Sequence, residues 1–139
     1  MAFRWPGTMS GMPEAEKITI NMNVVDLGKV DLLVEEGFYS NRTDFIRTAI
    51  RNQLAHHDDE VKRSVSRRAM AVGVLHYGRS DLERMKEQGE TMSIAVAGLF
   101  SLGQDVPPDL ARETILSIMV TGVFRASAAV KEALADRIQ

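Results

Sequence analysis

Histidines are sparse in this chain of 139 residues, which contains three of them, two in adjacent positions. The pair His56-His57 stands directly before the acidic run Asp58–Glu60, and imidazole and carboxylate groups are both common metal ligands. We interpret this cluster as the solvated end of a helix and predict no metal site there. His76 stands alone and is interpreted as a packed or surface histidine. The chain contains no cysteine, which excludes disulfides and thiolate metal sites.

No set of residues has the pattern of an active site. The sequence lacks a nucleophile beside a general base, a paired-carboxylate motif and a glycine-rich phosphate loop. It therefore predicts a protein that is not an enzyme and that uses no cofactor. The net charge is −2, and net charge concerns non-specific attraction rather than fold. Any binding function must therefore depend on local geometry.

Strict alternation of polar and apolar residues marks the segment Lys17–Met22. This period of two is typical of a strand with one buried face. The buried face comprises Ile18, Ile20 and Met22, and the exposed face comprises Lys17, Thr19 and Asn21. On the alternation alone, the exposed face is explained as a solvated strand surface.

Two short amphipathic helices are predicted to follow this strand, with apolar residues at steps of three and four. Asn23 is the predicted N-cap of the first helix, Gly37 ends it, and Ser40 caps the second. One strand and two short helices cannot bury their apolar residues alone, and a lone strand has two unpaired edges. The simplest remedy is a second copy of the chain, so that folding and dimerisation are one event. The helices would bury Leu27, Val30, Leu33, Val34, Phe45, Ile46, Ala49, Ile50 and Leu54.

Residues 17–54 resemble the ribbon-helix-helix family, which includes the MetJ, Arc and CopG repressors. The most specific part is Gly37–Arg47, which is similar to the family's turn and second-helix signature. The resemblance implies a homodimer that inserts a two-stranded antiparallel ribbon into the major groove of double-stranded DNA. It implies a sequence-specific transcriptional regulator, and we expect a repressor.

The resemblance also implies which residues contact DNA. The outward side chains of the ribbon, Lys17, Thr19 and Asn21, would contact base edges, because lysine donates to guanine and asparagine pairs with adenine. The start of the second helix would anchor a phosphate, because free N–H groups and the helix dipole favour an anion there. The predicted phosphate contacts are Ser40, Asn41 and Arg42, and the predicted dimer core is Ile18, Ile20, Met22, Leu33, Ile46 and Ile50.

An internal repeat with a step of 24 residues occupies the second half of the chain. The segment Ser93–Phe100 matches Ser117–Phe124, and Ala71–Leu75 is a weaker copy about 25 residues earlier. Each unit is predicted to be a strand followed by a helix, with parallel strand pairing. Gly98 and Gly122 are expected to mark bulges or a close approach of two backbones. The predicted strands are Ala71–His76, Ser93–Leu102 and Ser117–Arg125, and the predicted helices are Ser80–Gln88, Pro108–Ile115 and Ser127–Arg137.

The predicted fold class is α+β, with the ribbon-helix-helix module followed by a small α/β region. The predicted domains are a flexible N-terminal segment (1–13), the DNA-binding and dimerisation domain (14–55), a junction (56–69) and the strand-helix domain (70–139). The junction has no proline or glycine, and both a continuing helix and a flexible linker fit it. Its basic residues either contact phosphates or solvate a helix face; they are Lys62, Arg63, Arg67 and Arg68.

The function of the strand-helix domain has several open interpretations. Small repeat arrays usually need caps or partners, so we expect this domain to self-associate, joining dimers into a homotetramer or larger assembly. The alternatives are binding of an effector, an antitoxin-type protein that binds a partner protein through this half, and a DNA-associated assembly protein. No segment is long and apolar enough to span a bilayer, and we expect a cytoplasmic location without membrane association.

Overall fold

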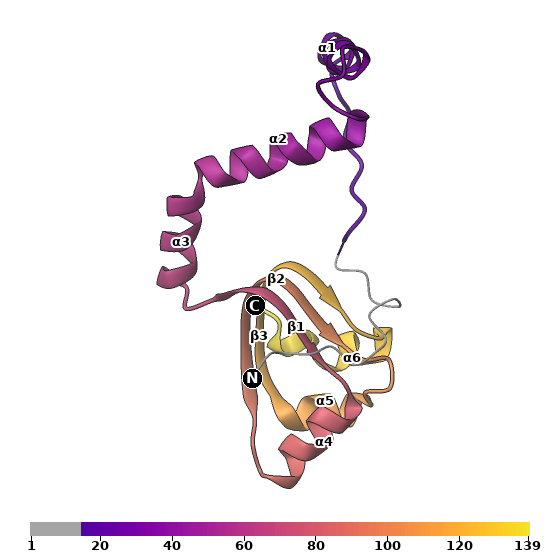
Figure 1. Cartoon of the computed structure of the whole chain (residues 1–139). Helices are drawn as coiled ribbons and strands as arrows, with labels where there is room; N and C mark the ends of the chain where they lie inside the picture. Colours follow the sequence, from indigo (N-terminus) through magenta and orange to yellow (C-terminus); the bar gives the residue numbers. More distant parts are fainter. Residues whose placement is uncertain (1–14) are drawn as a thin grey trace. The chain divides into compact units, whose positions relative to one another are not determined.

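The computed structural model describes residues 15–139 (Figure 1). The predicted flexible segment, residues 1–13, lies outside the described residues. The chain divides into two compact units between Arg63 and Ser64. This division falls inside the predicted junction, residues 56–69. Each unit is described here by itself.

The described part of the first unit contains two helices joined by a turn, α1 (Val24–Glu35) and α2 (Arg42–His56). The side chain of Asn23 begins α1: its Oδ1 accepts hydrogen bonds from the backbone N–H groups of Val25 (2.8 Å) and Asp26 (3.3 Å). The predicted N-cap is therefore confirmed. It satisfies N–H groups that have no partner inside the helix.

The turn between the two helices depends on Gly37, as predicted. Its φ of +84° lies in the left-handed region that favours glycine. The N–H of Gly37 donates to the carbonyl of Val34 (3.1 Å), and that of Phe38 donates to the carbonyl of Leu33 (3.0 Å). This pair of bonds closes the end of α1 and sends the chain toward α2.

The predicted strand Lys17–Met22 is not formed within a single chain, where residues 15–23 adopt neither helix nor strand. A strand requires a neighbouring strand, and none of the described strands pairs with Lys17–Met22. The prediction assigned that neighbour to a second copy of the chain, and this pairing remains a prediction.

Helix α3 (Asp58–Arg67) follows α2 after a break at His57. The backbone angles of His57, φ −101° and ψ 17°, depart from those of a regular helix. Of the two possibilities for the junction, the structure therefore shows a helix rather than a flexible linker, although the helix is interrupted. An ion pair of 2.9 Å between Lys62 and Asp58 spans one turn of α3.

The second unit alternates strands and helices, as the repeat predicts. Its sheet has the order β1-β2-β3, and both strand pairs are parallel. The predicted boundaries agree with the structure to within two residues for the strands. The elements are β1 (Ala71–Tyr77), α4 (Arg79–Glu87), β2 (Met92–Leu102), α5 (Pro108–Thr114), β3 (Ile115–Arg125), α6 (Ala128–Ala133) and the short 3-10 helix η2 (Ala135–Arg137). The predicted helix over Ser127–Arg137 is thus wrong in its last turn, where the chain tightens into η2.

The step of the sequence repeat equals the register of the parallel strands in the sheet. Residues 24 positions apart lie side by side on β2 and β3, including Gly98 beside Gly122 and Phe100 beside Phe124. Between β1 and β2 the step is 25 residues, and Gly73 lies beside Gly98. The repeat therefore specifies which residues of neighbouring strands come into contact.

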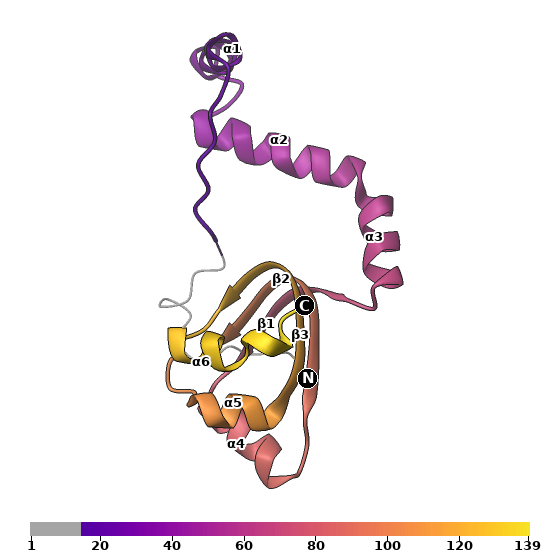
Figure 2. The ribbon, with the colours of Figure 1, turned by 180° about the vertical axis from the view of Figure 1, so that it is seen from behind.

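The core of the second unit lies between the sheet and its helices, which cover one face of the sheet (Figures 1 and 2). Phe100 on β2 is fully buried and stacks on Phe124 of β3, with ring centroids 5.2 Å apart. Helices α4, α5 and α6 each contribute apolar side chains to the same cluster. The most deeply buried members are Leu82, Phe100, Ala111, Ile115, Ile118, Val130 and Leu134.

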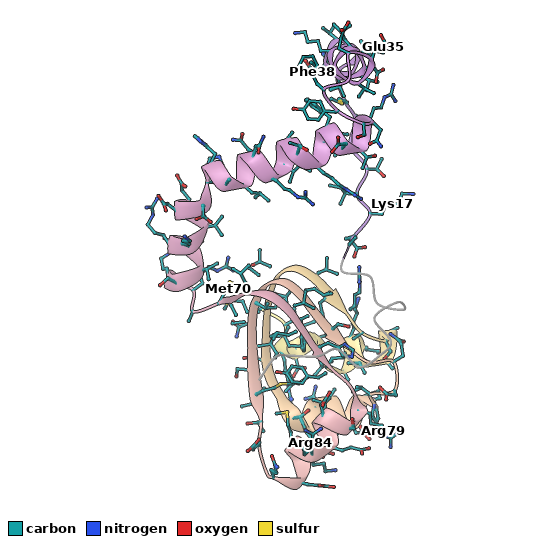
Figure 3. The ribbon with its side chains drawn as sticks, viewed as in Figure 1. Lys17, Glu35, Phe38, Met70, Arg79 and Arg84 are labelled. Carbon is teal, nitrogen blue, oxygen red and sulfur yellow. The ribbon has the colours of Figure 1, made fainter. Side chains whose placement is uncertain are left out.

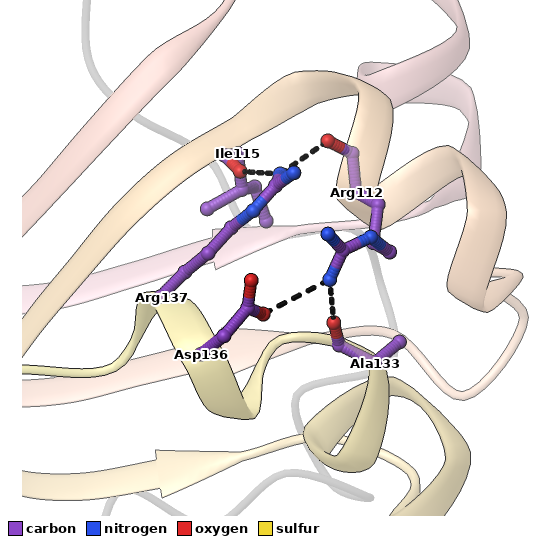
Figure 4. A network of polar contacts seen from close by, with 5 residues as sticks. All are labelled: Arg112, Ile115, Ala133, Asp136 and Arg137. Atoms are coloured by element: carbon purple, nitrogen blue, oxygen red, sulfur yellow. Dashed lines mark hydrogen bonds and ion pairs between the residues drawn. The ribbon is translucent and has the colours of Figure 1, made fainter.

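The C-terminal end of the chain is fastened to α5 and β3 (Figure 4). Arg137 donates from Nη1 to the backbone carbonyls of Arg112 and Ile115, the latter at 2.6 Å. Arg112 in turn donates to the carbonyl of Ala133 and to the carboxylate of Asp136 (2.9 Å). These reciprocal bonds hold η2 against the end of α5.

Candidate nucleic-acid interface

The three predicted base-contacting residues are solvent-exposed on one segment. Lys17, Thr19 and Asn21 alternate along residues 15–23, and all three side chains are exposed. Figure 3 shows the Lys17 side chain projecting away from the backbone. The segment thus presents an amine, a hydroxyl with a methyl group and an amide, which together can recognise base edges.

The apolar residues between them are also exposed. Ile18 is 75% exposed and Ile20 is 65% exposed, and Met22 is half-buried. Because the exposure of several large apolar side chains to water is unfavourable, we expect another apolar surface to pack on this face. The described residues of the same chain do not provide one.

The helices of the first unit also leave most of their apolar side chains exposed or half-buried. Val30 is the only buried side chain among residues 15–63. Of the other predicted dimer-core residues, Leu33 and Ile46 are half-buried and Ile50 is 48% exposed. Phe38 in the turn projects outward (Figure 3) and is 71% exposed. Residues 15–63 therefore contain helices, caps and a turn, but no core of their own.

Arg42, one of the predicted phosphate contacts, is bonded to α1. Its Nε and Nη2 atoms donate to the two carboxylate oxygens of Asp31, each at 2.8 Å. The hydrogen bond to Arg42 holds the pKa of Asp31 below its ordinary value, and the same bond raises the pKa of Arg42. This two-point ion pair fixes the start of α2 against the middle of α1.

The start of α2 is capped by Asn41 rather than by Ser40. The Asn41 side chain accepts from the N–H of Asp44 (2.8 Å), and the Asp44 carboxylate accepts from the N–H of Ser40 (3.0 Å). The predicted cap was thus wrong by one residue, since the hydrogen bond that the Asn41 side chain accepts from Asp44 makes Asn41 the cap and Arg42 the first helical residue. The N–H groups of Arg42 and Thr43 have no partner inside the helix.

A shallow pocket lies beside this helix start. It is lined by Ser40, Asn41, Thr43, Asp44, Arg47 and Arg51. Arg47 and Arg51 are exposed and follow Thr43 at steps of four, which places them on one face of α2. The sequence analysis missed both arginines, although this spacing could have identified them. Together with the helix dipole they can attract an anion.

The histidines at the end of α2 do not assemble a metal site. The rings of His56 and His57 meet edge to face, with centroids 5.1 Å apart, and His57 lies 3.3 Å from the side-chain nitrogen of Gln53. Within residues 15–139 no group of three or more histidine or acidic side chains could hold a metal ion. No helix in the same part of the chain is long and apolar enough to cross a membrane.

Comparison with known proteins extends the resemblance beyond the N-terminal unit. A model of the Ribbon-Helix-Helix transcriptional regulator family matches residues 13–131. The match includes most of the strand-helix domain, for which the sequence analysis had indicated no family. No curated protein and no solved structure matches the chain. Because the family model spans most of the 139 residues, the chain belongs to the ribbon-helix-helix transcriptional regulator family.

Proposed function

We propose that this protein is a sequence-specific DNA-binding repressor that acts as a homodimer. Its family is one of transcriptional regulators that bind DNA, and such regulators are normally not enzymes. The observation that carries the proposal is the alternating segment Lys17–Met22, in which Ile18 and Ile20 are largely exposed. We place its action in the cytoplasm, on double-stranded DNA, with no cofactor.

In the proposed dimer, the two copies of Lys17–Met22 pair as an antiparallel ribbon. Ile18, Ile20 and Met22 then turn toward the helices and pack on Leu33, Ile46 and Ile50. Complete burial of an isoleucine contributes roughly 1.5–3 kcal/mol, so eight isoleucines from two ribbons and two α2 helices, alongside the other apolar residues, would supply a substantial part of a core. Pairing also satisfies the backbone groups of the ribbon.

Lys17, Thr19 and Asn21 would lie on the opposite face of this ribbon. Because side chains on a strand alternate, burial of the isoleucines directs all three polar side chains outward together. Two copies give six such side chains on one surface, related by two-fold symmetry. The proposed operator therefore contains two related half-sites.

The phosphate contacts are proposed at the start of α2, from Ser40, Asn41 and Arg42. The guanidinium of Arg42 is bonded to Asp31, so its contribution would come from the backbone N–H. Arg47 and Arg51 supply positive charge in the same pocket. Such contacts position the protein on DNA without reading sequence.

The strand-helix domain is proposed to join dimers into a larger assembly. It folds around a core of its own, which favours a structured association domain over the charged, disordered tail typical of antitoxins. The regulator hypothesis therefore ranks above an antitoxin-type function. Purification of the chain with an unrelated bound protein would reverse this order.

Selection of bound DNA from a pool of random duplexes, with the full-length protein, tests the proposed function. We expect a recovered sequence with two related half-sites. Recovery of no preferred sequence, at low and at physiological salt, would contradict sequence-specific recognition.

A further inference from the structure

A column of three glycines crosses the sheet of the second unit. Gly73, Gly98 and Gly122 lie side by side on β1, β2 and β3. Their φ angles are +147°, +141° and +127°, which L side chains rarely adopt. The same glycine conformation therefore recurs at the same position in each of the three repeats.

Two of these glycines, Gly98 and Gly122, lie so close to the backbone of the neighbouring strand that a side chain would not fit. A Cβ on Gly98 would overlap the carbonyl oxygen of Gly73, and a Cβ on Gly122 would overlap the carbonyl oxygen of Gly98. In both cases the obstructing backbone belongs to the strand that precedes in the sheet order. The close approach that the sequence predicted at Gly98 and Gly122 is thus confirmed.

Gly73 has the same backbone conformation, but its corresponding side is open. A Cβ built on Gly73 would meet nothing within 4 Å, because β1 is the edge strand and no described strand precedes it. Its neighbour Val72 is 68% exposed. The first repeat therefore has the glycine at which a neighbouring backbone can approach closely, yet none of the described strands lies on that side.

The opposite edge of the sheet, at β3, is paired with another segment. Beyond β3 the chain's own end pairs with the sheet, since Ile138 forms a parallel bridge with Ile118 and the N–H of Gln139 donates to the carbonyl of Ile118 at 2.8 Å. Sheet edges are commonly protected by charged residues or proline. Strand β1 (Ala71–Tyr77) contains neither.

We infer that the free edge of β1 pairs with β1 of a second copy of this chain. A two-fold axis perpendicular to the sheet makes the two strands antiparallel and joins two three-stranded sheets into one sheet of six. The β1 backbone of the other copy then lies beside the open side of Gly73 in each copy, where no Cβ obstructs its approach. One symmetric contact satisfies both edges, and this is why a second copy fits better than an unrelated strand. The inference rests on the proposed self-association of this domain and names its surface.

Hydrogen exchange of the full-length protein, measured by mass spectrometry, reports on both proposed contacts at once. Alternate residues of β1 direct their backbone groups outward, so peptides covering Ala71–Tyr77 are expected to be as protected as those of β2. Peptides covering Lys17–Met22 report separately on the ribbon. Free exchange of the outward amides of β1, with the ribbon protected, would overturn the edge pairing and leave the DNA-binding dimer intact.

Two matched variants test the surface. Val72→Lys places a charge at the edge and is expected to remove the protection of β1 while the ribbon stays protected. Leu116→Lys changes an equally accessible side chain of β3, which is 55% exposed, and is expected to change neither. Retained protection of β1 in Val72→Lys would contradict the inference.

A cross-link shows whether the pairing joins two copies. The chain has no cysteine, so Val72→Cys and Leu116→Cys each carry a single thiol. A bis-maleimide is expected to give a covalent dimer with Val72→Cys and not with Leu116→Cys. A protected β1 without a covalent dimer would assign the edge to a segment of the same chain and overturn the second copy.

Discussion

The guanidinium of Arg42 holds both carboxylate oxygens of Asp31 at 2.8 Å. The two residues come from different helices, so this pair sets the position of the α2 start relative to α1. It also engages the Arg42 side chain, which leaves Arg47 and Arg51 as the arginines that line the pocket beside the α2 start. Arg42 is therefore expected to act mainly through position and through its backbone N–H.

Substitution of either partner tests this interpretation. Arg42→Ala and Asp31→Ala are each expected to lower the melting temperature of the first unit, and the double variant is expected to be no less stable than the worse single variant. The physical reason is that both changes remove one shared interaction. A double-mutant cycle of thermal unfolding measures this, and strictly additive effects would show that the two residues act independently.

The same pair predicts a dependence on acid. Because the pKa of Asp31 is lowered in the folded chain, its stabilisation is complete above the unfolded carboxyl pKa of about 3.9 and is lost as the pH falls through the lower folded value. The stability difference between wild type and Asp31→Asn should therefore shrink as the pH falls from 7 to about 2.5. Thermal melts monitored by circular dichroism measure it, with Glu35→Gln as a control in the same helix. A constant difference between wild type and Asp31→Asn over this range would contradict the assignment.

Arg47 and Arg51 are expected to act on DNA affinity without acting on sequence preference. Each arginine that neutralises a phosphate contributes about 0.9 to the slope of log Kobs against log salt. Arg47→Ala and Arg51→Ala should each reduce the slope by about that amount, equally for operator and random DNA. Fluorescence anisotropy at several salt concentrations measures the slope. Arg42→Ala serves as a comparison, and a larger change in its slope would return the phosphate contact to that side chain.

The second unit could be predicted from sequence because its information is local and repeated. Matching residues 24 positions apart, such as Gly98 and Gly122, indicated both the strands and their parallel neighbours. The bridge from Ile138 to Ile118 and the bonds of Arg137 to α5 could not be predicted. They join residues that are distant in the sequence and have no periodic pattern.

The first unit was predictable in its helices and less so in its contacts. Apolar residues at steps of three and four, together with the capping residues, indicated α1, its Asn23 cap and the Gly37 turn. The pair of Asp31 and Arg42 depends on how the two helices pack, which local patterns do not specify. The capping residue of α2 was displaced by one position, because Ser40 and Asn41 are both good caps and the bonds of Asp44 decide between them.

The glycine column predicts a large loss of stability on substitution. Gly122→Ala requires a backbone conformation that costs about 1–3 kcal/mol for a residue with a side chain, and its Cβ would also overlap the carbonyl oxygen of Gly98. Gly89→Ala is the control, because Gly89 has a φ of +66° but open space around it. Urea unfolding should show a clearly larger loss for Gly122→Ala. Equal losses in the two variants would show that the close approach of β2 and β3 contributes little.

The central claim is that a ribbon formed by residues 17–22 of two copies recognises DNA sequence through three side chains. The most direct test compares wild type with the variant in which Lys17, Thr19 and Asn21 are all alanine, by competition of operator against random DNA. Each lost base contact should cost on the order of 1–3 kcal/mol, so the variant should lose its preference while remaining a dimer in sedimentation. An unchanged preference for the operator in this variant would contradict the account.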